Sequence, residues 1–400
     1  FSSYRGFFQG QSNMTPTGVS QVIEALSKLV IGLGAAWFLV RQGYSLAVAA
    51  GGAVLGVTAG TVLAALYLSV KHRSAMDELN KMPSPAPSAS MSQTMKTLLA
   101  IAIPITIGAA GLQVINAFDQ KVVLGRLIDA GHYTQDAAEA LYGIYGKATT
   151  IFNLPSALIT PLTIAVIPSI TEHLTLNNHQ GSRTVSESAI RIMSLLALPC
   201  AVGMIVLGQP IMGLLYNYTG PTLETGGALL SWLGVSVLFN CLVLLTNAIL
   251  QANGRVNIPV YTMIAGGIIK LIVNYILVAQ PGLNILGAPI SSICCFGSIT
   301  IMNVIAMRRV IPDKIRVARV MVKPFLASAA MGLATYIAYD VVSTYLHSPT
   351  LGCLGAICVA VVVYAVFVYV LRCVTWEDCM LLPKGETIAK LLKVDRPKEI

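Results

Sequence analysis

A lysine lies deep inside one of the long apolar runs of this 400-residue chain, where a charge is costly unless it faces a cavity or a partner. Lys270 lies about thirteen residues into the run 258–279, which is roughly 20 Å along a helix and close to the middle of a bilayer. Its ammonium group could bind an anion such as a phosphate in an internal cavity, or it could form a plain interhelical ion pair. We expect the cavity role, with the ion pair as the alternative.

Three amide side chains accompany this lysine. Asn274 follows Lys270 by four residues, which places both side chains on one face of a helix. Asn247 and Gln251 are also four residues apart, in the preceding apolar run. Amides at such positions can bind the polar part of a cargo, and they can equally link helices by hydrogen bonds. All three are candidate cargo-binding residues, and interhelical bonding is the simpler interpretation.

Two further basic residues are candidates for contact with an anionic cargo. Lys147 follows Tyr145 and Gly146 in the outer third of its predicted helix, where it could bind a phosphate or extend to the membrane surface. Arg5 lies near the predicted cytoplasmic surface. Contact with an anionic headgroup and ordinary placement of a surface charge are equally compatible with that position.

Two acidic residues are candidates for coupling transport to a cation. Glu24 precedes Lys28 by four residues, which is the favourable orientation for a helical ion pair. The pair could simply neutralise itself, or Glu24 could bind a coupling proton or cation. Asp119 lies at the outer end of its apolar run, near Lys121 and Arg126. An interfacial salt bridge is the simplest interpretation there, and a gate contact would use the same residues.

The polar residues show no pattern of a catalytic or metal site. No cluster of His, Asp or Glu converges at one predicted membrane face, and no pair of the eight cysteines has metal-ligand spacing. The sequence therefore predicts no catalytic residue, no metal and no enzyme. We expect no cofactor, although a proton or sodium gradient could drive transport.

The composition places most of the chain in a membrane. Hydrophobic residues make up 55% of it, charged residues only 11%, and the mean hydropathy is +0.74. The apolar runs are continuous and about 20 residues long, whereas β-barrel strands are about half that length and alternate in polarity. The sequence predicts an all-α polytopic membrane protein with ten spans, near residues 19–40, 45–68, 97–118, 143–166, 192–212, 229–251, 258–279, 285–306, 324–343 and 350–371.

The distribution of Lys and Arg predicts the orientation of these spans. If the N-terminal end is cytoplasmic, twenty of the 26 basic residues lie in cytoplasmic segments, three in outer segments and three within spans. The net charge of +9 is then explained by the basic residues of the cytoplasmic segments, and nucleic-acid binding is not expected. Segment 71–94, rich in Pro, Ser and charges, is typical of a cytoplasmic linker, and 386–394 in the tail is a short amphipathic stretch.

Several sequence blocks resemble one family, in the order in which they occur. They include RGFFQGQSNMTPTGVSQVIE (5–24), AIPITIGAAGLQVINAFD (102–119), YGKATTIFNLPSALITPLTIAVIPSITEHL (145–174) and GVSVLFNCLVLLTNAILQANGRVNIPV (234–260). The chain is similar to the polysaccharide-type lipid flippases related to stage V sporulation protein B. These belong to the multidrug/oligosaccharidyl-lipid/polysaccharide exporter superfamily, which also contains the lipid II flippase. The resemblance covers essentially the whole chain.

This resemblance implies an architecture of fourteen helices, with two six-helix lobes and a final pair. The chain would hold helices five to fourteen and would be a fragment without the first helices. The implied divisions are a remnant of the N-terminal lobe (1–70), the linker (71–94), a C-terminal six-helix lobe (95–310), the final helix pair (311–373) and a cytoplasmic tail (374–400).

The resemblance also implies a function. Such proteins move a lipid-linked oligosaccharide or peptidoglycan precursor across the bacterial cytoplasmic membrane by alternating access, in cell-wall synthesis or sporulation. The expected partners are this lipid substrate and the membrane lipids, with the protein acting as a monomer. One alternative is a cation-coupled multidrug exporter of the same superfamily, whose cavity would need acidic groups. Another is a non-catalytic membrane partner of the cell-wall machinery.

Overall fold

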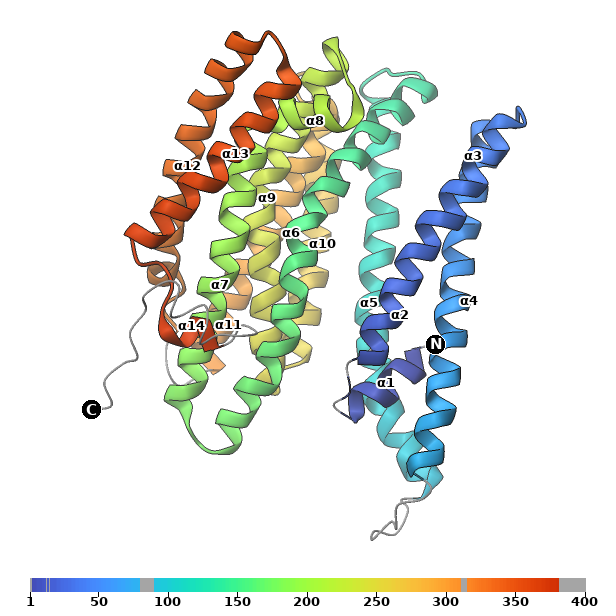
Figure 1. The fold of residues 1–400 in the computed structure, drawn as a ribbon, viewed down its shortest axis with the longest axis vertical. Helices are drawn as coiled ribbons and strands as arrows, with labels where there is room; N and C mark the ends of the chain where they lie inside the picture. The colour runs from blue at the N-terminus through green and yellow to red at the C-terminus, as the bar shows by residue number, and fades with distance from the viewer. Residues whose placement is uncertain (1, 12, 14, 80–89, 311–314, 381–400) are drawn as a thin grey trace. The chain divides into compact units, whose positions relative to one another are not determined.

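The computed structural model describes residues 2–11, 13, 15–79, 90–310 and 315–380 (Figure 1). Within these residues the chain forms helices and turns, with no strand. It divides into two compact units, residues 1–98 and 99–400, and each is described by itself.

The first unit packs two long helical segments against each other. The elements of this unit are α1 (Ser2–Gly10), α2 (Thr15–Ser27), η1 (Lys28–Gly32), α3 (Leu33–Arg41) and α4 (Leu46–Leu79). One long segment is α2 with η1 and α3, and the other is α4. Helices α2 and α3 continue into each other through η1, a single π-helical insertion. A Cβ atom at Gly60 would lie 2.8 Å from the carbonyl oxygen of Glu24, so a glycine allows α4 to approach α2 this closely.

The second unit is a bundle of long helices. Its elements are α5 (Met91–Asp129, which begins in the first unit), α6 (Gln135–Thr175), α7 (His179–Val206), α8 (Gly208–Tyr216), α9 (Gly220–Ala252), α10 (Asn257–Leu277), η2 (Asn284–Leu286), α11 (Gly287–Val310), α12 (Val317–Leu346), α13 (Pro349–Val370) and α14 (Trp376–Met380).

Helix α9 is the centre of this bundle. It packs against α6, α7, α8 and α11, and 56% of its most apolar stretch is buried, the largest share among the candidate spans in the described part of the chain. Leu229, Leu230 and Leu233 are among its fully buried side chains. Helices α12 and α13 form an antiparallel pair, in which α12 packs on α7 and α13 on α8 (Figure 1).

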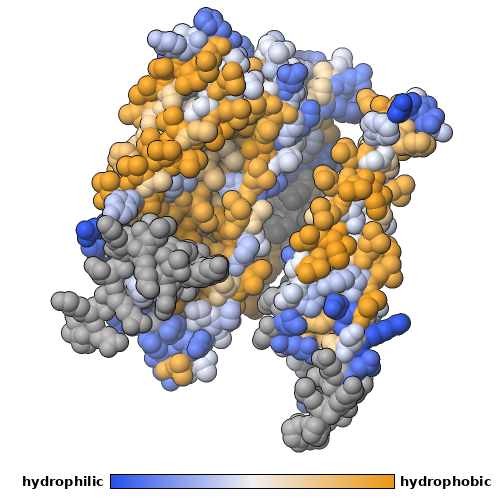
Figure 2. Space-filling view, viewed as in Figure 1, coloured by the Kyte–Doolittle hydropathy of each residue, from blue (hydrophilic) through white to orange (hydrophobic). Residues whose placement is uncertain are grey.

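Nine helices within the described residues are long and apolar enough to cross a bilayer. They coincide with nine of the ten predicted spans, and the tenth, 97–118, lies within α5. Figure 2 shows a broad apolar belt over the second unit, with hydrophilic residues above and below it. The protein is a multi-pass membrane protein, and the predicted all-α class is confirmed.

Several helices extend beyond the predicted spans. The segment 119–142, which lies between two of the predicted spans, is helical up to Asp129 and again from Gln135, where Thr134 accepts a hydrogen bond from the Ala137 amide. An apolar run marks only the lipid-buried part of a helix, because the polar turns beyond it keep their backbone hydrogen bonds in water.

The predicted cytoplasmic segments are only partly described. Helix α4 runs to Leu79 and α5 begins at Met91, so both ends of the predicted linker 71–94 are helical. Residues 80–89 and the amphipathic stretch 386–394 lie outside the described residues. The predicted domain boundaries therefore remain predictions.

Candidate functional site

A buried ion pair links α5 and α10 inside the second unit. The Nζ atom of Lys270 lies 2.7 Å from Oδ2 of Asp119, and these side chains are only 13% and 5% exposed. The Asn274 side chain, one turn after Lys270, donates a hydrogen bond from Nδ2 to Oδ1 of the same carboxylate. The helical spacing of four residues thus brings the lysine and the amide to one acid.

The position of Asp119 differs from the sequence-based expectation. It lies ten residues before the end of α5 rather than at the end of a helix, and its partner is Lys270. Lys121 is exposed, while Arg126 lies 4.2 Å from the centre of the Tyr275 ring and donates to the carbonyl oxygen of Tyr275. The expected interfacial salt bridge is therefore replaced by an internal one.

The ion pair faces a cavity of about 390 Å³. Side chains from α5, α6, α9, α10 and α11 line it, and the polar ones besides the ion pair are Tyr142, Tyr145, Thr149, Thr150, Asn153, Asn240 and Ser292. Phe152 and Phe296 stack at 6.1 Å on its wall. A charged pair surrounded by hydroxyl and amide groups can exchange hydrogen-bond partners with a polar cargo, which a fully apolar core cannot do.

Asn274 shows that this cluster is not fully paired. Its Oδ1 atom is buried and accepts no hydrogen bond from the residues that the structure describes. Such an atom costs about 1–3 kcal/mol, and the large majority of buried polar atoms in proteins do have a partner. Asn274 itself is not among the residues that line the cavity, so its unpaired oxygen belongs to the helix contact behind the ion pair.

Asn247 belongs to a different cluster, centred on Asn303. The Asn303 amide donates to Oδ1 of Asn247 at 2.8 Å and to Oγ1 of Thr246 at 3.0 Å, and Thr262 donates to Oδ1 of Asn303 at 2.8 Å. These residues join α9, α10 and α11 and are all buried. The contacts of Asn247 are those of interhelical hydrogen bonding. Gln251, one turn later, is exposed.

Lys147 does not join the ion-pair cavity. It is exposed, and its Nζ atom lies 5.1 Å and 4.8 Å from the ring centres of Tyr216 and Tyr218. This is the geometry of a cation–π interaction between α6 and the chain around the end of α8. The Lys147 ammonium group therefore contacts two tyrosine rings and does not line the cavity around Lys270.

The charged candidates of the first unit pair with one another. Glu24 uses both carboxylate oxygens, at 2.9 Å from Arg5 and 2.8 Å from Lys28, and Arg5 also donates to Ser20 at 3.0 Å. Lys28 is the first residue of the π-helical insertion η1. The arrangement matches the mutual neutralisation that we considered from the spacing of Glu24 and Lys28.

Sequence reasoning missed several residues of these clusters. Tyr142, Asn240 and Ser292 line the cavity, and Asn303 holds the second network together. Hydroxyls and single amides are common in membrane helices, so only the helix register reveals which of them meet. Among the described residues, no group of three His, Cys, Asp or Glu could hold a metal ion.

Fold and site define a helical, polytopic membrane protein whose long apolar helices line a cavity that contains an ion pair, an arrangement suited to a membrane transporter. The family model "Lipid II flippase MurJ" matches residues 19–353, so the chain belongs to this family. The resemblance to flippases related to stage V sporulation protein B is thereby confirmed.

Individual relatives support this assignment. The chain is 28% identical to lipid II flippase MurJ of Bacillus subtilis (strain 168) over 69% of its own length, and it spans about half (52%) of that relative. It is 24% identical to stage V sporulation protein B of the same organism, over 96% of this chain and 72% of that protein. The solved structure of a lipid II flippase MurJ in an inward closed conformation covers 92% of this chain and 69% of its own, with a TM-score of 0.64 and 14% identity. That likeness shows the shared fold.

Proposed function

We propose that the protein is a flippase that moves a lipid-linked saccharide, such as a peptidoglycan precursor, across the cytoplasmic membrane by alternating access. It acts on this substrate as a monomer surrounded by membrane lipids and leaves the substrate chemically unchanged. Membership of the lipid II flippase family supports the proposal. The Asp119–Lys270 pair in a polar cavity within membrane-spanning helices is the observation that carries it.

In this proposal Lys270 is the contact for the pyrophosphate of the cargo. A pyrophosphate cannot cross about 30 Å of hydrocarbon unaided, so the protein must offer a cation inside the bilayer. A free lysine at that depth would be expensive, and Asp119 neutralises it in the absence of cargo. The cargo then displaces the carboxylate from Lys270, with Asn274 holding the released acid.

We further propose that Asp119 couples transport to a proton or sodium gradient. A cation bound to Asp119 would release Lys270 for the anionic cargo, and loss of that cation would restore the ion pair. Glu24 is less suited to this role, because Arg5 and Lys28 already engage both of its oxygens. The proposal thus selects Asp119 from the two acidic candidates.

A reconstitution experiment tests the function. The purified protein is placed in vesicles with a fluorescent lipid-linked saccharide, and a quencher that cannot cross the membrane reports transfer between leaflets. We expect transfer above that of protein-free vesicles, with the mass of the lipid unchanged. Absence of transfer would refute a flippase, and a hydrolysed or polymerised product would indicate an enzyme instead.

The orientation is part of the proposal and has its own test. The excess of Lys and Arg in 71–94, 308–323 and 372–400 favours a cytoplasmic location for these segments. In a variant without native cysteines, a membrane-impermeant thiol reagent added to intact cells should label Thr222→Cys and not Ser88→Cys. Labelling at position 88 in sealed cells would invert the proposed topology.

A further inference from the structure

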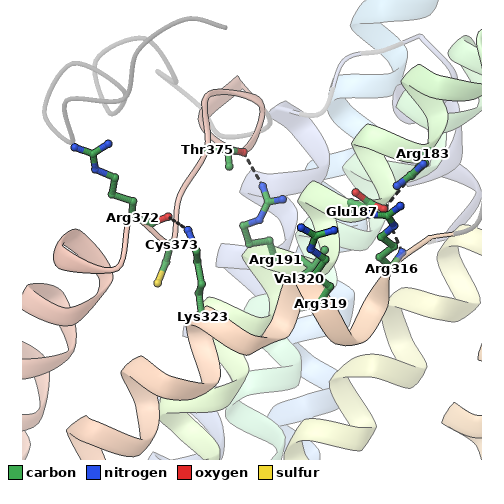
Figure 3. Close-up of a pocket in the computed structure, with 10 residues that line it drawn as sticks. All are labelled: Arg183, Glu187, Arg191, Arg316, Arg319, Val320, Lys323, Arg372, Cys373 and Thr375. Atoms are coloured by element: carbon green, nitrogen blue, oxygen red, sulfur yellow. Dashed lines mark hydrogen bonds and ion pairs between the residues drawn. The ribbon is translucent and has the colours of Figure 1, made fainter.

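A second cavity, of about 270 Å³, is lined by residues of α7, of the start of α12 and of the chain between α13 and α14 (Figure 3). We call it the basic pocket, defined by its six basic lining residues, Arg183, Arg191, Arg316, Arg319, Lys323 and Arg372. Glu187 is the only acidic residue among its described lining residues. The pocket shares no residue with the cavity around Asp119 and Lys270.

Helical spacing directs these charges into one place. Arg316, Arg319 and Lys323 occupy one face at the start of α12, three and four residues apart. Arg183 and Arg191 are eight residues apart on one face of α7, against which α12 packs. The pocket also lies at the N-terminal end of α12, where the helix dipole adds partial positive charge.

Two carboxylates neutralise only part of the charge. Glu187 pairs with Arg183 at 3.0 Å and also accepts the Arg316 backbone amide at 3.1 Å. Asp378 of α14, which is buried, pairs with Arg191 at 2.7 Å. These two pairs fix the walls of the pocket and account for two of its six cations.

The remaining cations keep their charge available. Within the described residues, the side chains of Arg316, Arg319 and Arg372 form no ion pair, and Lys323 donates only to the Arg372 carbonyl oxygen at 3.3 Å (Figure 3). Burial raises the pKa of the Cys373 thiol and the nearby Lys323 opposes this only in part, so the thiol adds no negative charge. Among the described residues the pocket therefore carries more positive than negative charge.

The surface beside the pocket is apolar and exposed. Val322, Phe325 and Leu326 on the next turns of α12 are each more than half exposed, as are Tyr369 and Val370 at the end of α13. Cationic groups directly next to lipid-facing side chains match a ligand with a charged head and apolar chains.

We propose that the basic pocket binds the phosphate-bearing headgroup of an anionic phospholipid, whose acyl chains lie along the exposed apolar faces of α12 and α13. Arginine guanidinium groups suit this role because they form paired hydrogen bonds to phosphate oxygens. The adjoining apolar surface favours a lipid over a free phosphate ion. This site is separate from the proposed cargo cavity and does not depend on flipping activity.

Native mass spectrometry of the delipidated protein in a neutral detergent tests the site. Phosphatidylglycerol is titrated into the protein, with phosphatidylcholine of the same acyl chains as the zwitterionic comparison of zero net charge. The variant Arg319→Gln with Lys323→Gln should bind the first phosphatidylglycerol about 25-fold more weakly, since each basic residue near a membrane surface contributes roughly fivefold. The matched control is Arg255→Gln with Arg309→Gln, which removes equal charge from exposed residues outside the pocket. It should stay within about twofold of the parent.

Three outcomes would overturn the proposal. The control could lose as much affinity as the pocket variant, which would mean unspecific attraction. Phosphatidylcholine could bind as tightly as phosphatidylglycerol, or inorganic phosphate at equal concentration could displace the lipid, which would mean a site for a soluble anion. Arg319→Lys, which keeps the charge but not the paired hydrogen bonds, should lose less affinity than Arg319→Gln. If the double variant does not fold, Arg319→Gln alone carries the same test with a loss of about fivefold.

Discussion

Two buried polar clusters each include residues of helix α10, and they differ in whether their polar groups are fully paired. Asn303 and its partners Thr246, Asn247 and Thr262 form a compact set of hydrogen bonds between three helices. The cluster of Asp119, Lys270 and Asn274 contains a full ion pair, faces a cavity and leaves the Asn274 oxygen without a partner in the described residues.

This contrast shows that depth in the membrane does not by itself identify a functional residue. Both clusters are polar and buried, and both link helices across the bundle. The first can be explained by packing alone, because its groups pair with one another. The second combines an ion pair that lines a cavity with an unpaired amide oxygen, and these features support the binding role proposed for it. Variants of each cluster should therefore fail in different ways.

The largest effect on stability is expected from Lys270→Ala. Removal of the cation leaves the buried carboxyl group of Asp119 without its ion-pair partner and with only the Asn274 amide as a donor, which costs about 3–5 kcal/mol. Thermal unfolding in detergent should show a large drop in melting temperature and low abundance in the membrane. A variant as stable as the parent would mean that the ion pair is not maintained in the membrane.

A smaller loss is expected from Asn303→Ala. The substitution leaves the polar groups of Thr246, Asn247 and Thr262 without their shared partner, at a cost of about 1–3 kcal/mol. The molecules that remain folded should transport at nearly the parental rate when activity is expressed per folded protein. Strongly reduced transport at normal stability would remove the distinction between the two clusters.

The smallest effect is expected from Lys147→Ala. This charge is exposed and contacts two tyrosine rings, an interaction worth roughly 0.5–1 kcal/mol at an exposed site. Melting temperature and transport should both change little. Because Lys147 and Lys270 are both lysines within predicted spans, a severe transport defect here would show that the cargo follows a route other than the Lys270 cavity.

The sequence predicts the fold well and the site only in part. Apolar length and the placement of charges predicted the helical class and the spans, since the bilayer imposes both. Apolar length does not predict how far a helix continues beyond the bilayer, because that part of the helix is polar. Asp119 follows directly after an apolar run and was placed at a helix end, whereas α5 continues through ten further residues.

Partners of polar residues depend on helix register, which the sequence does not contain. Asn247 and Asn274 look alike in the sequence, each in an apolar run with a second polar residue four positions away. In the structure Asn247 bonds to Asn303 on α11, whereas Asn274 bonds to Asp119 on α5. Only these contacts with other helices distinguish the two asparagines. The depth of Lys270 predicted a place in the cavity between the lobes or, as the alternative, an interhelical partner. The structure shows the partner, Asp119, beside a cavity that the second unit lines, and the role toward a cargo stays a prediction.

The double variant Lys270→Ala with Asp119→Asn is the sharpest test of the proposed role of the Lys270 cation in transport. It removes both charges together, so the stability penalty of an unpaired carboxylate disappears and the folded protein should accumulate in the membrane. The account predicts that this folded protein flips the lipid-linked saccharide at least about tenfold more slowly than the parent, because the cavity has lost its cation. Flipping at the parental rate by the folded double variant would contradict the account.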